Sequence, residues 1–104
     1  MGYIITVLEV IKSPEFTAWM AKLKDRVAAM SIAARIRRAT LGSLGDHKFL
    51  RDGVSEMRVD VGAGYRMYFT RKGATVVLLL CGGDKRSQDA DIQRAIELAR
   101  VWKD

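Results

Sequence analysis

The chain has 104 residues, of which 49% are hydrophobic, and this size and composition are typical of one compact globular domain. Its net charge of +6, from 18 Lys and Arg against 12 Asp and Glu, favours a polyanionic or acidic partner, although positive charge also serves solubility. One cysteine and one histidine exclude an internal disulfide and a zinc site with the usual sulfur and nitrogen ligands, so we expect no metal and no other cofactor. No apolar run reaches the roughly 20 residues that cross a bilayer, and the N-terminus lacks a basic signal region, so a cytoplasmic protein is expected.

The N-terminal part of the chain predicts a strand followed by a helix. Residues 3–10, YIITVLEV, are rich in β-branched side chains and precede a Lys-Ser-Pro boundary, which is typical of a strand. Ser13, Pro14 and Glu15 then supply an N-cap, a proline at the first helical position and an acid in the first turn. An apolar stripe at helical spacing follows and is expected to face the core: Phe16, Trp19, Met20 and Leu23.

A second helix is predicted to run antiparallel to the first. Asp25 can cap it, and it should end before Gly42, where a left-handed residue is expected. Its core-facing residues at helical spacing are Ala29, Ile32, Ala33 and Ile36. Three arginines near its end complement the helix dipole, which explains them without a ligand, and contact with nucleic acid is the less favoured alternative: Arg35, Arg37 and Arg38.

The second half of the chain predicts strands and a last helix. Residues 47–51 read as a short strand that Asp52-Gly53 connects to the next. Residues 56–71 alternate between apolar and polar side chains, interrupted by a turn at 62–64; a second turn at 72–73 leads into an almost unbroken apolar run, and this pattern indicates two consecutive hairpins. Ser87 can cap a final helix, whose first turn carries two acids and whose apolar stripe should be Ile92, Ala95, Ile96, Ala99 and Trp102.

The first of these hairpins should carry one apolar and one charged face. A three-residue loop at 62–64 would set Val61, Val59 and Met57 opposite Tyr65, Met67 and Phe69. The other face would then pair Asp60 with Arg66, Arg58 with Tyr68, and Glu56 with Thr70.

The order strand, helix, helix, three or four antiparallel strands, helix predicts an α+β domain. Helices would cover one face of a twisted antiparallel sheet, and the other face, or part of it, would be available for function.

The charged face suggests chemistry on a phosphodiester. Arg58, Arg66 and Tyr68 would lie near Lys85 and Arg86 if the last strand pairs beside residues 65–71. Arginine binds phosphate through a rigid fork of donors, and a metal-free ribonuclease needs little beyond such cations, a base and an acid. Glu56 or His47 could be the base. The alternative is a solvated face laced with ion pairs.

The run GDHKFLRDGVSEMRVDVGAGYRMYF, followed by LLLCGGDKRSQDADI, resembles the RelE/HigB superfamily of bacterial toxins. The similarity is to the branch of phage-derived addiction-module killer proteins, in which the phrases GD-x-K, GV-x-E-L-R, G-P-G-Y-R-V-Y-F and GGDK-x-x-Q-x-x-D-I occur in this order. With the helix hairpin included, it covers about residues 13–98. Ala63 departs from the proline of the third phrase, which loosens the turn without touching the chemistry.

The resemblance implies a RelE/ParE-like fold and the toxin of a type II toxin–antitoxin module. Such toxins usually cut mRNA on the ribosome and are neutralised by an antitoxin from the same operon, often a helix-turn-helix protein. Arg66 would stabilise the transition-state phosphate and Lys85 would stabilise charge or protonate the leaving oxygen, with Arg58 beside them and Glu56 as a candidate base. Residues expected to hold RNA are Lys48, Arg51, Tyr68 and Arg86.

Two questions stay open from the sequence. Catalytic sets vary across the superfamily, so the base could be Glu56, His47 or Asp91. A relative of the same fold that inhibits DNA gyrase, like ParE, or a non-catalytic protein that only binds an acidic partner, is the alternative function.

Overall fold

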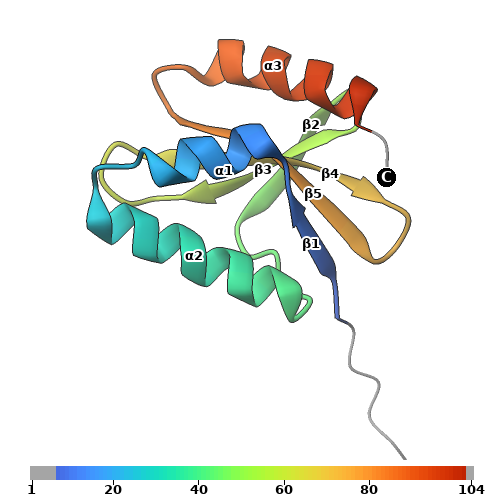
Figure 1. The fold of residues 1–104 in the computed structure, drawn as a ribbon, viewed down its shortest axis with the longest axis horizontal. Coiled ribbons are helices and arrows are strands. Elements are labelled where there is room, and N and C mark those ends of the chain that lie inside the picture. The colour runs from blue at the N-terminus through green and yellow to red at the C-terminus, as the bar shows by residue number, and fades with distance from the viewer. Residues whose placement is uncertain (1–6, 103–104) are drawn as a thin grey trace, which may run out of the picture.

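The computed structural model describes residues 7–102, which form three helices and one five-stranded sheet (Figure 1). Positions 3–6 of the expected first strand lie outside these residues, and the strand is seen only from Glu9. The elements in chain order are β1 (Glu9–Lys12), α1 (Pro14–Ala21), α2 (Arg26–Thr40), β2 (His47–Arg51), β3 (Val54–Val59), β4 (Tyr65–Lys72), β5 (Val76–Asp84) and α3 (Gln88–Val101).

The predicted ends of the first two helices are confirmed. The Ser13 hydroxyl accepts a hydrogen bond from the Phe16 N–H at 3.0 Å and donates to the Leu80 carbonyl at 2.6 Å, so the cap also fixes α1 to β5. The Asp25 carboxylate accepts from the Ala28 N–H at 3.0 Å at the start of α2. Gly42 follows α2 with φ of 95°, the left-handed conformation that ends a helix.

The sheet is mixed, so the expectation of a purely antiparallel sheet is wrong. Its order is β1-β5-β4-β3-β2, and β1 pairs in parallel with β5 while every other pair is antiparallel. β1 meets a strand more than sixty residues away in sequence, with Glu9 opposite Val76. Side-chain alternation identifies a strand but not such a distant partner.

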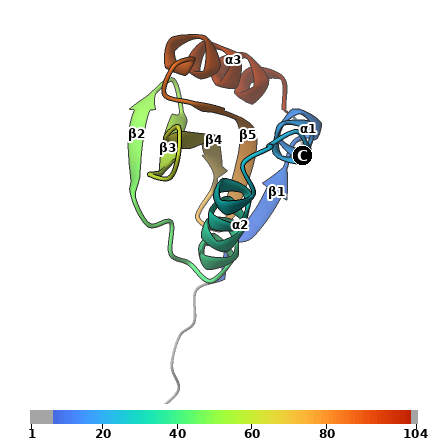
Figure 2. The same ribbon diagram turned by 90° about the vertical axis from the view of Figure 1, so that its left-hand side faces the viewer.

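Helices cover both faces of the sheet, which corrects the expectation that they cover one (Figure 2). α1 and α2 pack on the face that carries Val77 and Leu79, and α3 packs on the face that carries Leu78 and Leu80. Val77, Leu78, Leu79 and Leu80 are all buried, as expected for a strand covered on both sides, and the unbroken apolar run of β5 is the sign of this arrangement. The α+β class is confirmed.

The β3–β4 hairpin has the predicted faces but a different register. Its loop spans residues 60–64 instead of 62–64, and Met57 lies opposite Met67 instead of Phe69. A shift of two residues returns every side chain to the same face, so burial of the apolar face does not distinguish the two registers. Glu56 therefore lies opposite Tyr68, and Arg58 lies opposite Arg66.

The predicted two-residue turn between β2 and β3 is confirmed. Asp52 and Gly53 both have positive φ, 51° and 78°, as a type I′ hairpin turn requires. In residues 7–102, none of the helices has the length and hydrophobicity needed to span a membrane.

Candidate functional site

Three basic side chains meet at one end of the sheet. Arg58 on β3 lies directly opposite Arg66 on β4, and Lys85 follows the last residue of β5, which pairs beside β4. All three line a cleft of about 290 Å³. The other residues around it are Asp46, Val59, Asp60, Gly64 and Tyr65.

The direct opposition of two arginines is unfavourable unless each is compensated. Like charges opposite each other on neighbouring strands destabilise a sheet. Here Arg58 donates to the Asp46 carboxylate at 3.0 Å, and Arg66 donates to the Glu56 carboxylate at 2.8 Å. Each arginine therefore has its own carboxylate, and the sheet tolerates both.

Arg66 is held in one orientation from two sides. Its side chain is only 17% exposed, and that of its partner Glu56 is 5% exposed. The amide of Gln88 at the start of α3, with its oxygen turned toward Arg66, accepts from the guanidinium at 3.0 and 3.3 Å. This arrangement gives a cation of fixed position at the inner wall of the cleft.

Arg58 and Lys85 are the accessible cations of the cleft. The side chain of Arg58 is 43% exposed, and its hydrogen bond to Asp46 raises the pKa of the guanidinium. Lys85 is exposed, and its methylene groups pass close to Gly64, where a Cβ atom would lie 3.4 Å from Cδ of the lysine. Glycine also suits this position because its φ is +77°.

Tyr68 lies on the same face of the sheet as Glu56, but α3 covers it there, so its expected contact with RNA is wrong. It is fully buried in the core under α3, and its hydroxyl has no hydrogen-bond partner within the described part of the chain. Burial raises the pKa of this hydroxyl. The alternating pattern placed Tyr68 on the correct face, but it could not show that α3 covers that part of the face.

The three remaining residues expected to hold RNA do not line the cleft. Lys48 is exposed on the edge strand β2, opposite Glu56 and on the same face of the sheet. Arg51 is at the far end of β2 and pairs with Asp52 at 3.5 Å. Arg86 is turned back onto Asp84, which it contacts at 2.9 Å, and its hydrogen bonds lower the pKa of that carboxyl.

Two of the three candidate bases are unsuitably placed. Glu56 is buried and bound to Arg66. His47 lies opposite Met57, on the face of α1 and α2, with its ring 6.4 Å from that of Phe69. Neither carboxylate nor imidazole is therefore presented to a substrate in the cleft.

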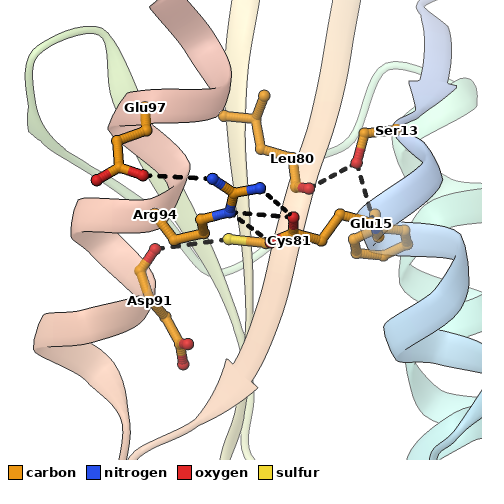
Figure 3. A network of polar contacts seen from close by, with 8 residues as sticks. Ser13, Glu15, Leu80, Cys81, Asp91, Arg94 and Glu97 are labelled. Atoms are coloured by element: carbon orange, nitrogen blue, oxygen red, sulfur yellow. Dashed lines mark hydrogen bonds and ion pairs between the residues drawn. The ribbon is translucent and has the colours of Figure 1, made fainter.

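Asp91, the third candidate, belongs to a polar network that ties α3 to α1 across β5 (Figure 3). Its backbone carbonyl accepts from the Cys81 thiol at 3.5 Å, and its carboxylate accepts from Ser87 at 2.5 Å. Arg94 spans the same gap through a forked contact with Glu15, at 2.7 to 3.0 Å. The network fixes α3 on the sheet and leaves Asp91 outside the cleft.

Two carboxylates that the sequence analysis did not consider as bases do reach the cleft: Asp46 and Asp60. Asp46 immediately precedes β2, and Asp60 immediately follows β3, so both stand where a strand ends beside the arginines. Asp60 was expected to pair with Arg66, which binds Glu56 instead. These two carboxylates could have been found in the sequence from their positions at predicted strand ends, whereas the alternation of side chains within the strands does not indicate them.

No family model matches the chain. A protein of Haemophilus influenzae strain Rd, described as uncharacterized, is 47% identical to it over 85 residues. The matched region covers 82% of this chain and 86% of that protein.

Proposed function

We propose that this chain, which belongs to the same family as the Haemophilus influenzae protein, is the toxin of a type II toxin–antitoxin module and has a RelE/ParE-like fold. It cuts mRNA without a metal ion, in the cytoplasm and on the ribosome. Its partner is an antitoxin of the helix-turn-helix type from the same operon.

One observation carries the proposal: Arg58, Arg66 and Lys85, from three different strands or strand ends, line one cleft. A phosphodiester gains negative charge when the 2′-hydroxyl attacks phosphorus, and cations fixed around that position stabilise the transition state. A cleft of about 290 Å³ has room for the linkage and part of the flanking nucleotides.

The three cations have different roles in this proposal. Arg66 is preorganised by Glu56 and Gln88 and binds a non-bridging oxygen of the phosphate. Arg58 exchanges its exposed contact with Asp46 for a second phosphate oxygen. Lys85 is accessible and protonates the leaving 5′-oxygen.

Asp60 is the best-placed base for the 2′-hydroxyl. It lines the cleft, and within residues 7–102 its carboxylate has no ion-pair partner, whereas Asp46 is occupied by Arg58. It also lies on the loop after β3, where it can adjust to a bound substrate.

The carboxylates of the cleft favour one alternative function, that of a non-catalytic binding protein. Asp46 and Asp60 reduce the positive charge of the cleft, and an ion-paired surface is also what a non-catalytic binding protein would have. Such a protein would share the fold and would bind its partner without cutting RNA.

Controlled expression in a bacterium, followed by pulses of labelled amino acid, uridine or thymidine, tests the proposal. We expect amino-acid incorporation to stop first, and Lys85→Ala to relieve the arrest. Lys72→Ala is the matched control, because this lysine is also exposed but lies at the other end of β4. If DNA synthesis stops first, the protein is a gyrase inhibitor and not an mRNA nuclease. If growth is unchanged while soluble protein accumulates, both functions are rejected.

A further inference from the structure

A second hollow of about 520 Å³ runs along α2 and is distinct from the cleft. Its wall on α2 includes Val27, Met30, Ala34 and Arg38 beside the polar Ser31 and Arg35, and the end of β3 with the following loop adds Val59, Asp60 and Val61. We call this hollow the α2 groove. Most of its lining is apolar, and two elements contribute to it, so the hollow is a concave surface and not the result of a single exposed side chain.

Two apolar side chains of the α2 groove are unusually exposed. Val27 is 64% and Met30 is 73% accessible, although both lie on a helix whose other side is in the core. Residues 27, 30 and 34 follow each other at helical spacing and form a single stripe. From Val27 to Arg38 this stripe is about 16 Å long, from a rise of 1.5 Å per residue, which equals three turns of a partner helix.

The charged side chains that α2 itself contributes have one sign, and Asp60, after β3, adds one carboxylate to the groove. α2 contains four arginines and neither Asp nor Glu. Arg35 is used by the fold, because it donates to the carbonyls of Leu44 and Asp46 at 2.9 and 3.0 Å. The others are exposed and stand around the stripe: Arg26, Arg37 and Arg38.

We infer that the α2 groove binds an amphipathic, acidic helical segment of a partner protein. Apolar side chains of that segment would cover Val27 and Met30, and its carboxylates would pair with the exposed arginines. A second copy of this chain fits less well, since two such helices would bring arginines together and the chain has a net charge of +6. Only the identification of the partner as the antitoxin rests on the proposed function.

The position of the groove gives the bound segment a second effect. Val59 and Asp60 line both the α2 groove and the cleft. A partner helix in the groove therefore stands at the edge of the cleft and obstructs RNA there without entering it.

The test uses a fluorescently labelled designed peptide of about 18 residues, long enough to form a helix, with leucines at helical spacing and glutamates on the flanks. Anisotropy measures its affinity for the full chain. We expect Met30→Ser to weaken binding about tenfold and Arg38→Gln to weaken it several-fold. Val101→Ser is the matched control, because Val101 is 71% exposed at the end of α3, and it should have no effect.

Three results would overturn the inference. The first is no binding; the second is equal binding of a scrambled peptide of the same composition, which would mean that charge alone acts. The third is a dimer, seen by sedimentation, that Met30→Ser dissociates, because a second copy would then occupy the groove. None of these readouts involves RNA cleavage, so the proposed binding by the α2 groove and the proposed nuclease activity are tested independently.

Discussion

Two ion pairs stand side by side on one face of the sheet, and they differ mainly in their burial. Arg66–Glu56 has side chains 17% and 5% exposed, whereas Arg58–Asp46 has side chains 43% and 54% exposed. The start of α3 adds Gln88 to the first pair, while the second faces solvent at the end of β3. The difference teaches that two arginines directly opposite each other in one hairpin can serve different ends. The buried one stabilises the fold, and the exposed one remains accessible to a ligand.

The largest effect is expected from breaking the buried pair. Arg66→Ala leaves the Glu56 carboxylate buried without its cation, so the free energy of unfolding should fall by about 3–5 kcal/mol. Urea unfolding followed by circular dichroism measures this loss. Arg58→Ala is the control and should leave the midpoint nearly unchanged, because its pair is exposed. Equal losses in both variants would remove the distinction between the two pairs.

This prediction also limits what Arg66 can show about catalysis. Loss of activity in Arg66→Ala could follow from a weakened fold, so Arg58 and Lys85 are the better residues for kinetic tests. Both are exposed and neither fills the core.

The buried region beneath α3, next to the Arg66–Glu56 pair, also contains Cys81. Burial raises the pKa of its thiol from an ordinary value near 9 to about 12. In the unfolded chain the thiol loses its proton near pH 9, so its contribution to stability is complete below pH 9 and is lost as the pH rises toward 12. The free energy of unfolding should fall by up to about 1.4 kcal/mol per pH unit through this group.

Urea titrations at several pH values between 8 and 11 measure that slope. Cys81→Ala should make it shallower, whatever the change in absolute stability. Identical slopes in the two proteins would show that the thiol is not held in its neutral form by burial.

A smaller effect is expected at Tyr68, next to Glu56 on the neighbouring strand. Because its buried hydroxyl has no partner within the described residues, Tyr68→Phe removes an unsatisfied group and should be neutral or stabilise by about 1 kcal/mol. RNA binding should not change. A large loss of stability would mean that the hydroxyl has a partner, such as a buried water.

The smallest effect is expected from freeing the exposed arginine. Asp46→Asn removes the carboxylate that pairs with Arg58 and that, in the proposed function, competes with phosphate for it, so affinity for an uncleavable 2′-deoxy RNA analogue should rise a few-fold at low salt. Fluorescence anisotropy at two salt concentrations measures it. Weaker binding would assign Asp46 a direct role in holding RNA.

The sequence predicted the local features of this fold well. Ser13, Asp25 and Gly42 mark helix ends, and Asp52-Gly53 marks a turn, because each depends on the backbone of only a few neighbouring residues. Arg58, Arg66 and Lys85 were placed near one another by the alternation of two hairpins, and they do line one cleft.

The remaining features depend on contacts between distant parts of the chain. The parallel partner of β1 and the packing of α3 on the second face are not encoded in any local pattern. The register of the β3–β4 hairpin was missed because a two-residue shift leaves both faces unchanged. Burial of Tyr68 and of the Glu56–Arg66 pair follows from the packing of α3, so it could not be derived from alternation alone.

The most direct test of the central claim is cleavage of a defined mRNA by the purified protein, either with ribosomes in a magnesium buffer or without ribosomes in the presence of EDTA. The convergence of three cations on one linkage predicts cuts that require a 2′-hydroxyl, and Lys85→Ala and Arg58→Ala should each slow them about 100-fold or more while Lys72→Ala does not. If neither substitution at the cleft slows the cutting, or if no RNA is cut with or without ribosomes, the account of this cleft as a nuclease site is contradicted.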